Sequence, residues 1–269
     1  MLDVLDINRD YDLFIQRIKK KTNINLQLYK EDQMKRRLTA YKTRKGFRTF
    51  DDFFKAMMQN EQLYEDFLNH MTINVTEFFR NPSRWGVLEK NILPQILKGK
   101  RRIRCWSAAC STGEEPYSLA LMLSSFFEWQ DIRILATDIN HQVIARAKEG
   151  KYKEEALKNV PSSMKDRFFE HRDGHYEITA TVRKSVQFRQ QNLLSDPFES
   201  GFDLIICRNV LIYFTDEAKV QLFKKFSRAL NPGGYLFVGG SEQIYQPQKY
   251  QLEETDTFFY KKTQERWTW

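Results

Sequence analysis

The chain has 269 residues, of which 41% are hydrophobic and 29% are charged, a composition that is typical of folded proteins and excludes a disordered one. Its longest apolar stretch, Leu119–Phe127, is too short to span a membrane, and the acidic first residues do not resemble a signal or transit peptide. The three cysteines form no Cys-x-x-Cys pair, and His171 and His175 lack further ligands nearby in sequence. We therefore expect no disulfides, no metal, no membrane insertion and a cytoplasmic location.

The net charge of +8 is concentrated in one segment. Between Arg17 and Arg48 there are twelve Lys and Arg residues against Glu31 and Asp32, a balance of +10, so the remaining residues sum to −2. A basic surface confined to one part of a chain is typical of a docking site for an acidic partner.

Residues 1 to about 75 show helical periodicity. Apolar residues recur three or four positions apart. Gly46 is predicted to end a helix, and Thr49 or Asp51 is predicted to open the next one. The expected helices contain Tyr11–Ile18, Met34–Tyr41, Phe53–Met57 and Glu61–His70. This part is predicted to be a small all-α domain.

From Arg101 onward, short apolar runs alternate with helical patterns. The expected strands are 102–107, 132–137, 186–190, 202–207, 235–239 and 258–262, and the expected helices are 115–127, 143–148 and 217–230. This alternation predicts an α/β fold, a doubly wound, mostly parallel sheet with helices on both faces. Asp173-Gly174 and the alternating Tyr176, Ile178 and Val182 predict a small antiparallel insertion at about 172–187.

Ligands bind at the carboxyl ends of strands in such sheets. The first strand is followed by Ala-Ala-Cys-Ser-Thr-Gly-Glu-Glu-Pro, ending at Pro116, which lacks the glycines and lysine of phosphate loops. Carboxylates at Glu114 and Glu115 suit a cationic ligand such as an ammonium group. An equally good alternative is that both only complement the helix dipole.

Three further strand ends carry polar residues. Asp138 ends the second strand, where an acidic residue commonly accepts hydrogen bonds from ribose hydroxyls, although Asp also caps helices. Asn192 follows another strand and can present its amide to an adenine edge. Arg208 and Asn209 follow the apolar strand 202–207 directly. A nucleoside site without phosphate affinity, with a carboxylate for an ammonium group, indicates S-adenosylmethionine.

These residues lie in motifs that resemble the chemotaxis receptor methyltransferase (CheR) family over nearly the whole chain. The most specific is Trp-Ser-Ala-Ala-x-Ser-Thr-Gly-Glu-Glu-Pro-Tyr-Ser, which starts at Trp106. The other matching segments are Thr72–Arg80, Ala136–Ile139, Asn192–Leu194 and Cys207–Phe214. The resemblance implies a Rossmann-like class I methyltransferase that esterifies glutamate side chains of bacterial chemoreceptors.

The resemblance also implies the site residues. Cofactor contacts are expected from Asn74, Thr76, Arg80, Glu115, Asp138, Asn192, Leu193, Arg208 and Asn209. Arg80 and Tyr213 are expected nearest the reacting atoms. Arg37 corresponds to a basic position that the family uses for receptor docking, and Arg44 and Arg48 keep the charge around it.

The family implies three regions: a helical, basic receptor-docking domain (1–75), a linker and entry helix (76–99), and a methyltransferase domain (100–264). The insertion holds a receptor's carboxyl-terminal pentapeptide in some members. Here it is short and carries a single Gly174, so we expect no such tether. We expect a monomer that acts on the helical coiled-coil region of membrane-bound receptors.

Two other functions are compatible with parts of the sequence. The basic segment is compatible with a nucleic-acid methyltransferase. However, the sequence has neither an Asn/Asp-Pro-Pro-Tyr/Phe motif for exocyclic amines nor a Pro-Cys nucleophile for cytosine. The other alternative, a non-catalytic cofactor sensor, is disfavoured because Arg80, Asp138, Asn209 and Tyr213 are all present.

Overall fold

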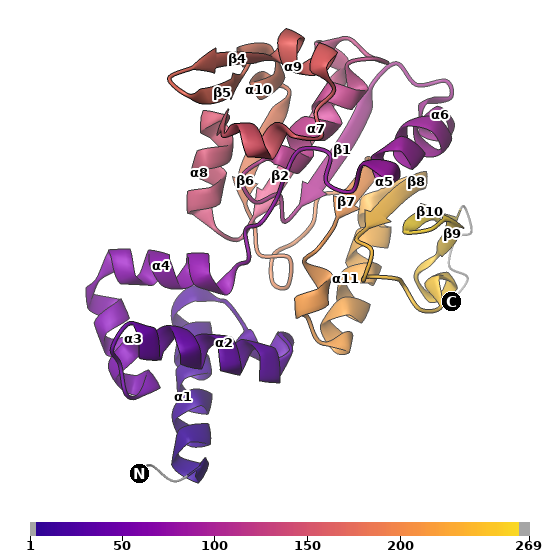
Figure 1. Ribbon diagram of the computed structural model, residues 1–269. Helices are drawn as coiled ribbons and strands as arrows, with labels where there is room; N and C mark the ends of the chain where they lie inside the picture. Colours follow the sequence, from indigo (N-terminus) through magenta and orange to yellow (C-terminus); the bar gives the residue numbers. More distant parts are fainter. Residues whose placement is uncertain (1–3, 264–269) are drawn as a thin grey trace. The chain divides into compact units, whose positions relative to one another are not determined.

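The computed structural model describes residues 4–263, which divide into two compact units (Figure 1). Of the described residues, the helical unit contains 4–73, together with Leu194–Asp196 and Tyr213–Leu222. The sheet unit contains Asn74–Leu193, Pro197–Ile212 and residues 223–263. The domain boundaries expected from sequence stay a prediction.

Four helices build the helical unit, close to where the sequence predicts them. They are α1 (Val4–Thr22), α2 (Glu31–Arg44), α3 (Phe50–Gln59) and α4 (Glu61–Met71). Thr49, not Asp51, caps α3, because its hydroxyl accepts from the Asp52 amide at 3.0 Å. The helices pack through aromatic rings: Phe14 lies 4.9 Å from Phe50 and 5.9 Å from Phe53, centroid to centroid.

A distant segment completes the helical unit. The amide of Lys30 donates to the Tyr213 carbonyl and the amide of Thr215 donates to the Leu28 carbonyl, both at 2.9 Å. Between these bonds, Tyr29 and Phe214 form an antiparallel bridge, and their rings meet edge to face at 5.0 Å. Residues 28–30 and 213–215 thus pair as a short two-stranded ribbon.

The sheet unit is built on seven strands in the order β6-β2-β1-β7-β8-β10-β9. Their bounds are β1 (Ile103–Ala108), β2 (Ile132–Asp138), β6 (Val186–Gln190), β7 (Phe202–Cys207), β8 (Leu230–Val238), β9 (Leu252–Asp256) and β10 (Phe259–Lys262). The first five strands in this order are parallel, and β10 pairs antiparallel with both of its neighbours, β8 and β9. The predicted doubly wound, mostly parallel sheet is confirmed.

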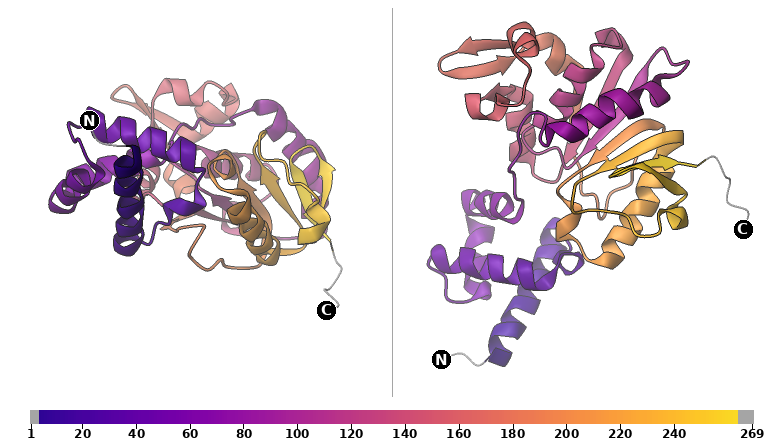
Figure 2. Two further views of the ribbon diagram at one scale, coloured as in Figure 1. Left: turned by 90° about the horizontal axis from the view of Figure 1, so that it is seen from below. Right: turned by 45° about the vertical axis from the view of Figure 1, so that its right-hand side comes forward.

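Helices cover both faces of the sheet (Figure 2). On one face, residues of β2 and β6 such as Ile134 and Val186 share a core with Leu119 and Ile144. On the other face, Trp106 packs 5.5 Å from Phe226. The helices of this unit are α5 (Pro82–Val87), a π-helical turn (Leu88–Ile92), α6 (Leu93–Leu97), α7 (Glu114–Leu123), α8 (His141–Glu149), α9 (Ser162–Phe168), α10 (Ala180–Lys184) and the part of α11 (Asp216–Ala229) that begins at Phe223.

The antiparallel insertion is present, but the predicted range 172–187 is wrong. It is a three-stranded sheet in the order β3-β5-β4, made of β3 (Lys151–Tyr152), β4 (Phe169–Arg172) and β5 (His175–Ile178). Asp173 and Gly174 form the expected turn with positive φ. Val182, however, lies in α10, and Val186 already pairs in parallel with β2. An apolar residue four positions after Ile178 fits a helix as well as a strand.

Within residues 4–263, none of the helices has the length and apolar content needed to cross a membrane. The same residues contain no group of three or more His, Cys, Asp or Glu side chains placed to hold a metal ion.

Candidate active site

The carboxyl ends of four parallel strands meet at one edge of the sheet. The last residue of β1, Ala108, lies in register with Thr137 of β2, and Asp138 lies in register with Gln190 of β6. The strand β7 runs beside β1 and ends at Cys207. The loops that follow these strands are therefore neighbours, as the sequence predicts.

The loop after β1 is tightly turned against β2. Ala109, Ser111 and Gly113 all have positive φ, which costs free energy for the two residues with side chains. The Cys110 amide donates to the Thr137 carbonyl at 2.9 Å, which ties the loop to its neighbour. The loop thus presents its backbone at the sheet edge, where small residues permit close approach of a ligand.

Asp138 is buried at this edge and is oriented by two amides. Its Oδ2 accepts from the Ser111 amide at 2.9 Å, and its Oδ1 accepts from the Asn140 amide at 3.0 Å. Burial raises the pKa of Asp138, and hydrogen bonds from these two amides and from the Ile139 amide oppose that rise. A carboxylate has about four acceptor sites, so a further donor can still bind Asp138. The cap of α8 is Asn140, whose side chain accepts from the Gln142 amide, so the alternative that Asp138 caps this helix is wrong.

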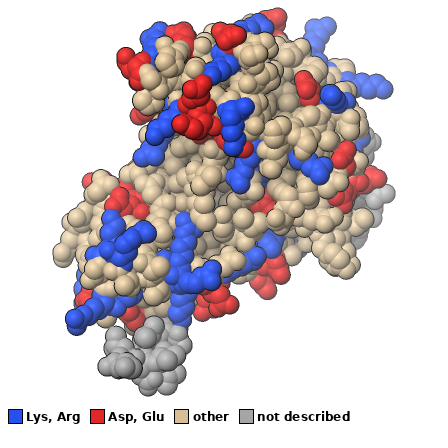
Figure 3. Space-filling view, in the orientation of Figure 1, with Lys and Arg blue, Asp and Glu red and all other residues tan. Residues whose placement is uncertain are grey.

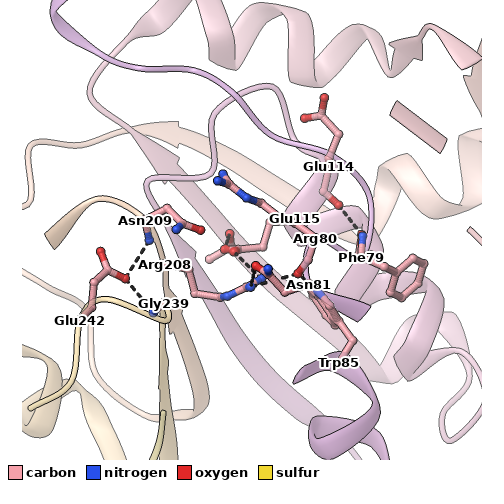
Figure 4. Close-up of polar contacts among 12 residues, drawn as sticks. Phe79, Arg80, Asn81, Trp85, Glu114, Glu115, Arg208, Asn209, Gly239 and Glu242 are labelled. Carbon is pink, nitrogen blue, oxygen red and sulfur yellow. Dashed lines mark hydrogen bonds and ion pairs between the residues drawn. The ribbon is translucent and has the colours of Figure 1, made fainter. Parts of the chain in front are cut away.

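Glu115 and Arg208 face each other across the same edge (Figure 4). Oε1 of Glu115 accepts from the Ser107 hydroxyl at 2.8 Å, and Oε2 lies 3.8 Å from Nη1 of Arg208. Burial raises the pKa of Glu115 and lowers the pKa of Arg208, while their mutual attraction opposes both shifts. Glu114, in contrast, accepts from the Thr112 hydroxyl at 2.7 Å within the loop.

The Nε–H donor of Arg208 is not used by the described residues of the site. Its Nη2 donates at 3.0 Å to the Arg80 carbonyl and to Oδ1 of Asn81. Its Nε is buried and has no hydrogen-bond partner among the described residues. A buried donor of this kind costs free energy unless a ligand acceptor reaches it.

The segment Asn74–Arg80 lies along the loop after β1. The carbonyl of Asn74 accepts from the Ser111 hydroxyl at 3.4 Å, and the Phe79 amide donates to the Ser118 hydroxyl at 2.9 Å. Nη1 of Arg80 donates to the Val75 carbonyl at 2.9 Å. Arg80 also lies close enough to lower the pKa values of Glu115 and Arg208. Asn74, Thr76 and Arg80 are thus brought to the same edge as Glu115.

The loop after β6 joins this edge. The Gln191 amide donates to the Asp138 carbonyl at 2.9 Å, which places half-buried Asn192 and buried Leu193 directly beyond it. The carbonyl of Leu193 accepts from Nζ of Lys225 at 2.8 Å.

Glu242 was missed by the sequence analysis. Its carboxylate accepts from the amides of Gly239, Asn209, Leu211 and Ile212 at 2.7–3.3 Å, and it thereby fixes the loop that carries Arg208 and Asn209. Burial raises the pKa of Glu242, and these four amides oppose the rise. The available signal was the run Gly-Gly-Ser-Glu that follows an apolar strand.

Tyr213 and Arg37 lie together in the helical unit. Both line a cavity of about 390 Å³, with Lys30, Met34, Ile73 and other residues of α2. Burial lowers the pKa of Arg37. Arg44 and Arg48 are exposed and do not line this cavity; the Arg44 guanidinium lies 5.4 Å from the Tyr41 ring centroid. Lys and Arg side chains predominate on the visible face of the helical unit (Figure 3).

Comparison with known families agrees with the motifs. Residues 74–259 match the family described as "CheR methyltransferase, SAM binding domain", and residues 9–72 match "CheR methyltransferase, all-alpha domain". The chain belongs to the CheR methyltransferase family. The predicted family and the S-adenosylmethionine-binding methyltransferase domain are confirmed.

Relatives resemble this CheR family member over most of their length. A chemotaxis protein methyltransferase of Listeria monocytogenes is 44% identical, covering 96% of this chain and 99% of the relative. Chemotaxis protein methyltransferase 1 of Pseudomonas aeruginosa is 33% identical over a region that covers 91% of this chain and 94% of the relative. A chemotaxis protein methyltransferase of Borreliella burgdorferi is 35% identical over 82% of this chain.

The residues at the sheet edge of this CheR methyltransferase fit S-adenosylmethionine. This cofactor has hydroxyl, ammonium and carboxylate groups. The sheet edge has side chains of complementary chemistry: the carboxylates of Asp138 and Glu115 and the buried Nε donor of Arg208.

Proposed function

We propose that the protein transfers a methyl group from S-adenosylmethionine to glutamate side-chain carboxylates of bacterial chemoreceptors, giving glutamate methyl esters and S-adenosylhomocysteine. The observation that carries this proposal is the 44% identity to a chemotaxis protein methyltransferase over 96% of the chain. The paired Glu115 and Arg208 beside Asp138 support it, because they suit an amino-acid nucleoside rather than a phosphate ligand.

The cofactor contacts follow the sheet edge. Asp138 would bind the ribose hydroxyls, Glu115 the ammonium group and Arg208 the carboxylate, with Asn192 and Leu193 at the adenine. Asn74, Thr76, Arg80 and Asn209 complete the proposed set. When bound, S-adenosylmethionine supplies an electrophilic methyl group on a sulfonium centre.

The protein's part in the chemistry is positioning. A glutamate with a pKa of about 4.3 is already ionised at neutral pH, so the reaction needs no general base. Water stabilises the separated charges of carboxylate and sulfonium more than the transition state in which they neutralise each other. A site that excludes water and aligns the reactants within ~3–3.5 Å therefore accelerates transfer. We assign Arg80 and Tyr213 to orienting the carboxylate.

The helical unit is the proposed receptor-docking part. Arg37, Arg44 and Arg48 would meet the acidic surface of a receptor coiled coil. The cavity that Arg37 and Tyr213 line together supports a role for this unit in receptor binding. We propose that residues 1–75 dock, residues 76–99 link and residues 100–264 catalyse. The protein would act as a cytoplasmic monomer, recruited to membrane-bound receptors.

The test is methylation of a receptor cytoplasmic fragment with isotope-labelled S-adenosylmethionine, followed by mass spectrometry of its peptides. We expect label on glutamate side chains, released by mild base as an ester would be. A fragment with those glutamates changed to glutamine is the control. Label that appears on RNA or DNA and not on the receptor would refute the proposal.

A further inference from the structure

Tyr152 connects three parts of the sheet unit. It lies in β3 of the antiparallel insertion and is 5% exposed. Its hydroxyl donates to the Thr112 carbonyl at 2.8 Å, in the loop after β1. Its ring meets the ring of Phe78 edge to face, with 4.8 Å between centroids. One side chain of the insertion therefore contacts the loop that precedes Glu115 and the segment that carries Asn74, Thr76 and Arg80.

The residues that follow Tyr152 hold the second of these segments. The Phe78 amide donates to the Ala156 carbonyl at 3.0 Å. Nδ2 of Asn159 donates to Oε1 of Glu77 at 3.2 Å, and Nζ of Lys158 lies 2.6 Å from the other carboxylate oxygen. Backbone and side chains of residues 156–159 thus fix Glu77 and Phe78, which directly follow Thr76.

The loop after β1 presses closely against Tyr152. A Cβ atom added at Gly113 would lie 3.1 Å from the Tyr152 hydroxyl oxygen and 2.9 Å from Cβ of Ala147. Thr76, Thr112 and Tyr152 also line one cavity of about 760 Å³. This side of the loop borders a cavity. If the Tyr152 hydroxyl is removed, few other side chains are therefore close enough to hold the loop in place.

We propose that Tyr152 is a positioning residue for methyl transfer. It holds the loop after β1 and the segment Asn74–Arg80 in the arrangement that lets Glu115 and Thr76 meet the cofactor. This role rests on the proposed function, because it takes those two residues as cofactor contacts. The antiparallel insertion thereby becomes a determinant of cofactor affinity, in addition to any contact it makes with a receptor.

The test compares Tyr152→Phe with Tyr176→Phe. Tyr176 is the register partner of Tyr152 in β5, and its interactions are with Lys165 and His171 of the insertion. For Tyr152→Phe we expect the Kd for S-adenosylhomocysteine to rise about five- to tenfold, the range that one neutral hydrogen bond supports. Hydrogen exchange should become faster at the amides of residues 111–113 and 76–79. For Tyr176→Phe we expect both quantities at wild-type values.

A second variant, Asn159→Ala, removes the donor to Glu77 and should shift the Kd in the same direction. Wild-type affinity in both Tyr152→Phe and Asn159→Ala, or equal weakening by Tyr176→Phe, would overturn the proposal, since Tyr152 would then only pack the insertion. Affinity for S-adenosylhomocysteine is measured without receptor. A wild-type protein that binds it but methylates no receptor would refute the proposed function alone.

Discussion

Nη1 of Arg208 lies 3.8 Å from Oε2 of Glu115, and the side chains are only 3% and 14% exposed. A buried carboxylate and a buried guanidinium each depend on the other for charge compensation, because desolvation penalises both. The ionisation of Glu115 is therefore linked to the presence of Arg208.

The first prediction concerns this linkage. Burial raises the pKa of Glu115, and only the ionised carboxylate pairs with an ammonium group. Affinity for S-adenosylhomocysteine should thus strengthen as pH rises through the pKa of Glu115. Arg208→Met removes the attraction that opposes this rise in the pKa. The midpoint of the pH dependence of binding should then move to higher pH, in addition to a general loss of affinity. Calorimetry from pH 5 to pH 8 measures this, with Glu115→Gln as a control that should lose this pH dependence. An unmoved midpoint in Arg208→Met contradicts the linkage.

The second prediction concerns Asp138. Asp138→Ala should weaken binding of S-adenosylhomocysteine by about 1.5–3 kcal/mol, the usual contribution of hydrogen bonds to a charged acceptor. Asp131→Ala, just before the other end of β2, is the matched control and should bind normally. If calorimetry shows unchanged affinity for Asp138→Ala, Asp138 does not bind the ribose hydroxyls.

The third prediction concerns Glu242. Glu242→Gln replaces one acceptor oxygen by a donor, which faces amide donors that it cannot satisfy. We expect the free energy of unfolding to fall by about 3–6 kcal/mol, the loss of two charge-assisted bonds. Denaturant unfolding measures this change. Gln243→Ala, at the exposed neighbour, should stay within about 0.5 kcal/mol of the wild type. If the two variants were equally stable, the hydrogen bonds from the four amides to Glu242 would not contribute to the stability of the fold.

The fourth prediction concerns Tyr213. Tyr213→Phe should fold, bind S-adenosylhomocysteine almost normally and lose about a hundredfold in kcat, since misplacing a reactant has effects of that size. Tyr245→Phe, at a tyrosine that is 83% exposed, should keep wild-type kcat. If Tyr213→Phe also keeps the wild-type kcat, the Tyr213 hydroxyl has no part in methyl transfer.

The fifth prediction concerns the basic surface. Changing Arg37, Arg44 and Arg48 to Glu should raise the KM for receptor strongly and leave cofactor affinity intact. The wild-type KM should itself rise with salt, because exposed ion pairs are weak and screened. The same charge change at exposed Lys98, Arg101 and Arg102 is the control, with no effect on KM expected. A wild-type KM for the first variant in low salt would show that this surface does not dock receptors.

Most elements of the sheet could be predicted because buried parallel strands are apolar and end abruptly in polar residues. The strand β9 could not, since Glu253, Glu254 and Thr255 are exposed and resemble a loop. The strand β3 has only two residues and exists through pairing with β5. Neither carries a periodic pattern that sequence reasoning could detect.

The site was predictable where each residue follows its own strand, as with Asp138 and Arg208. Glu242 was not, because the four amides that it accepts from lie in two loops about 30 residues apart. Likewise, no local pattern assigns Tyr213 to the helical unit, since its partner is the backbone of Lys30.

The pairing of residues 28–30 with residues 213–215 has a consequence for synthesis. In a chain that emerges from the ribosome, α1–α4 are synthesised early. Phe214, the partner of Tyr29, is synthesised about 185 residues after it. At ordinary rates of translation this delay is on the order of ten to forty seconds. Throughout that interval the Tyr29 ring lacks the edge-to-face contact with Phe214, and the Lys30 amide lacks the acceptor it has in the mature fold. The helical unit therefore completes its own pairing only after most residues of the sheet unit have been synthesised.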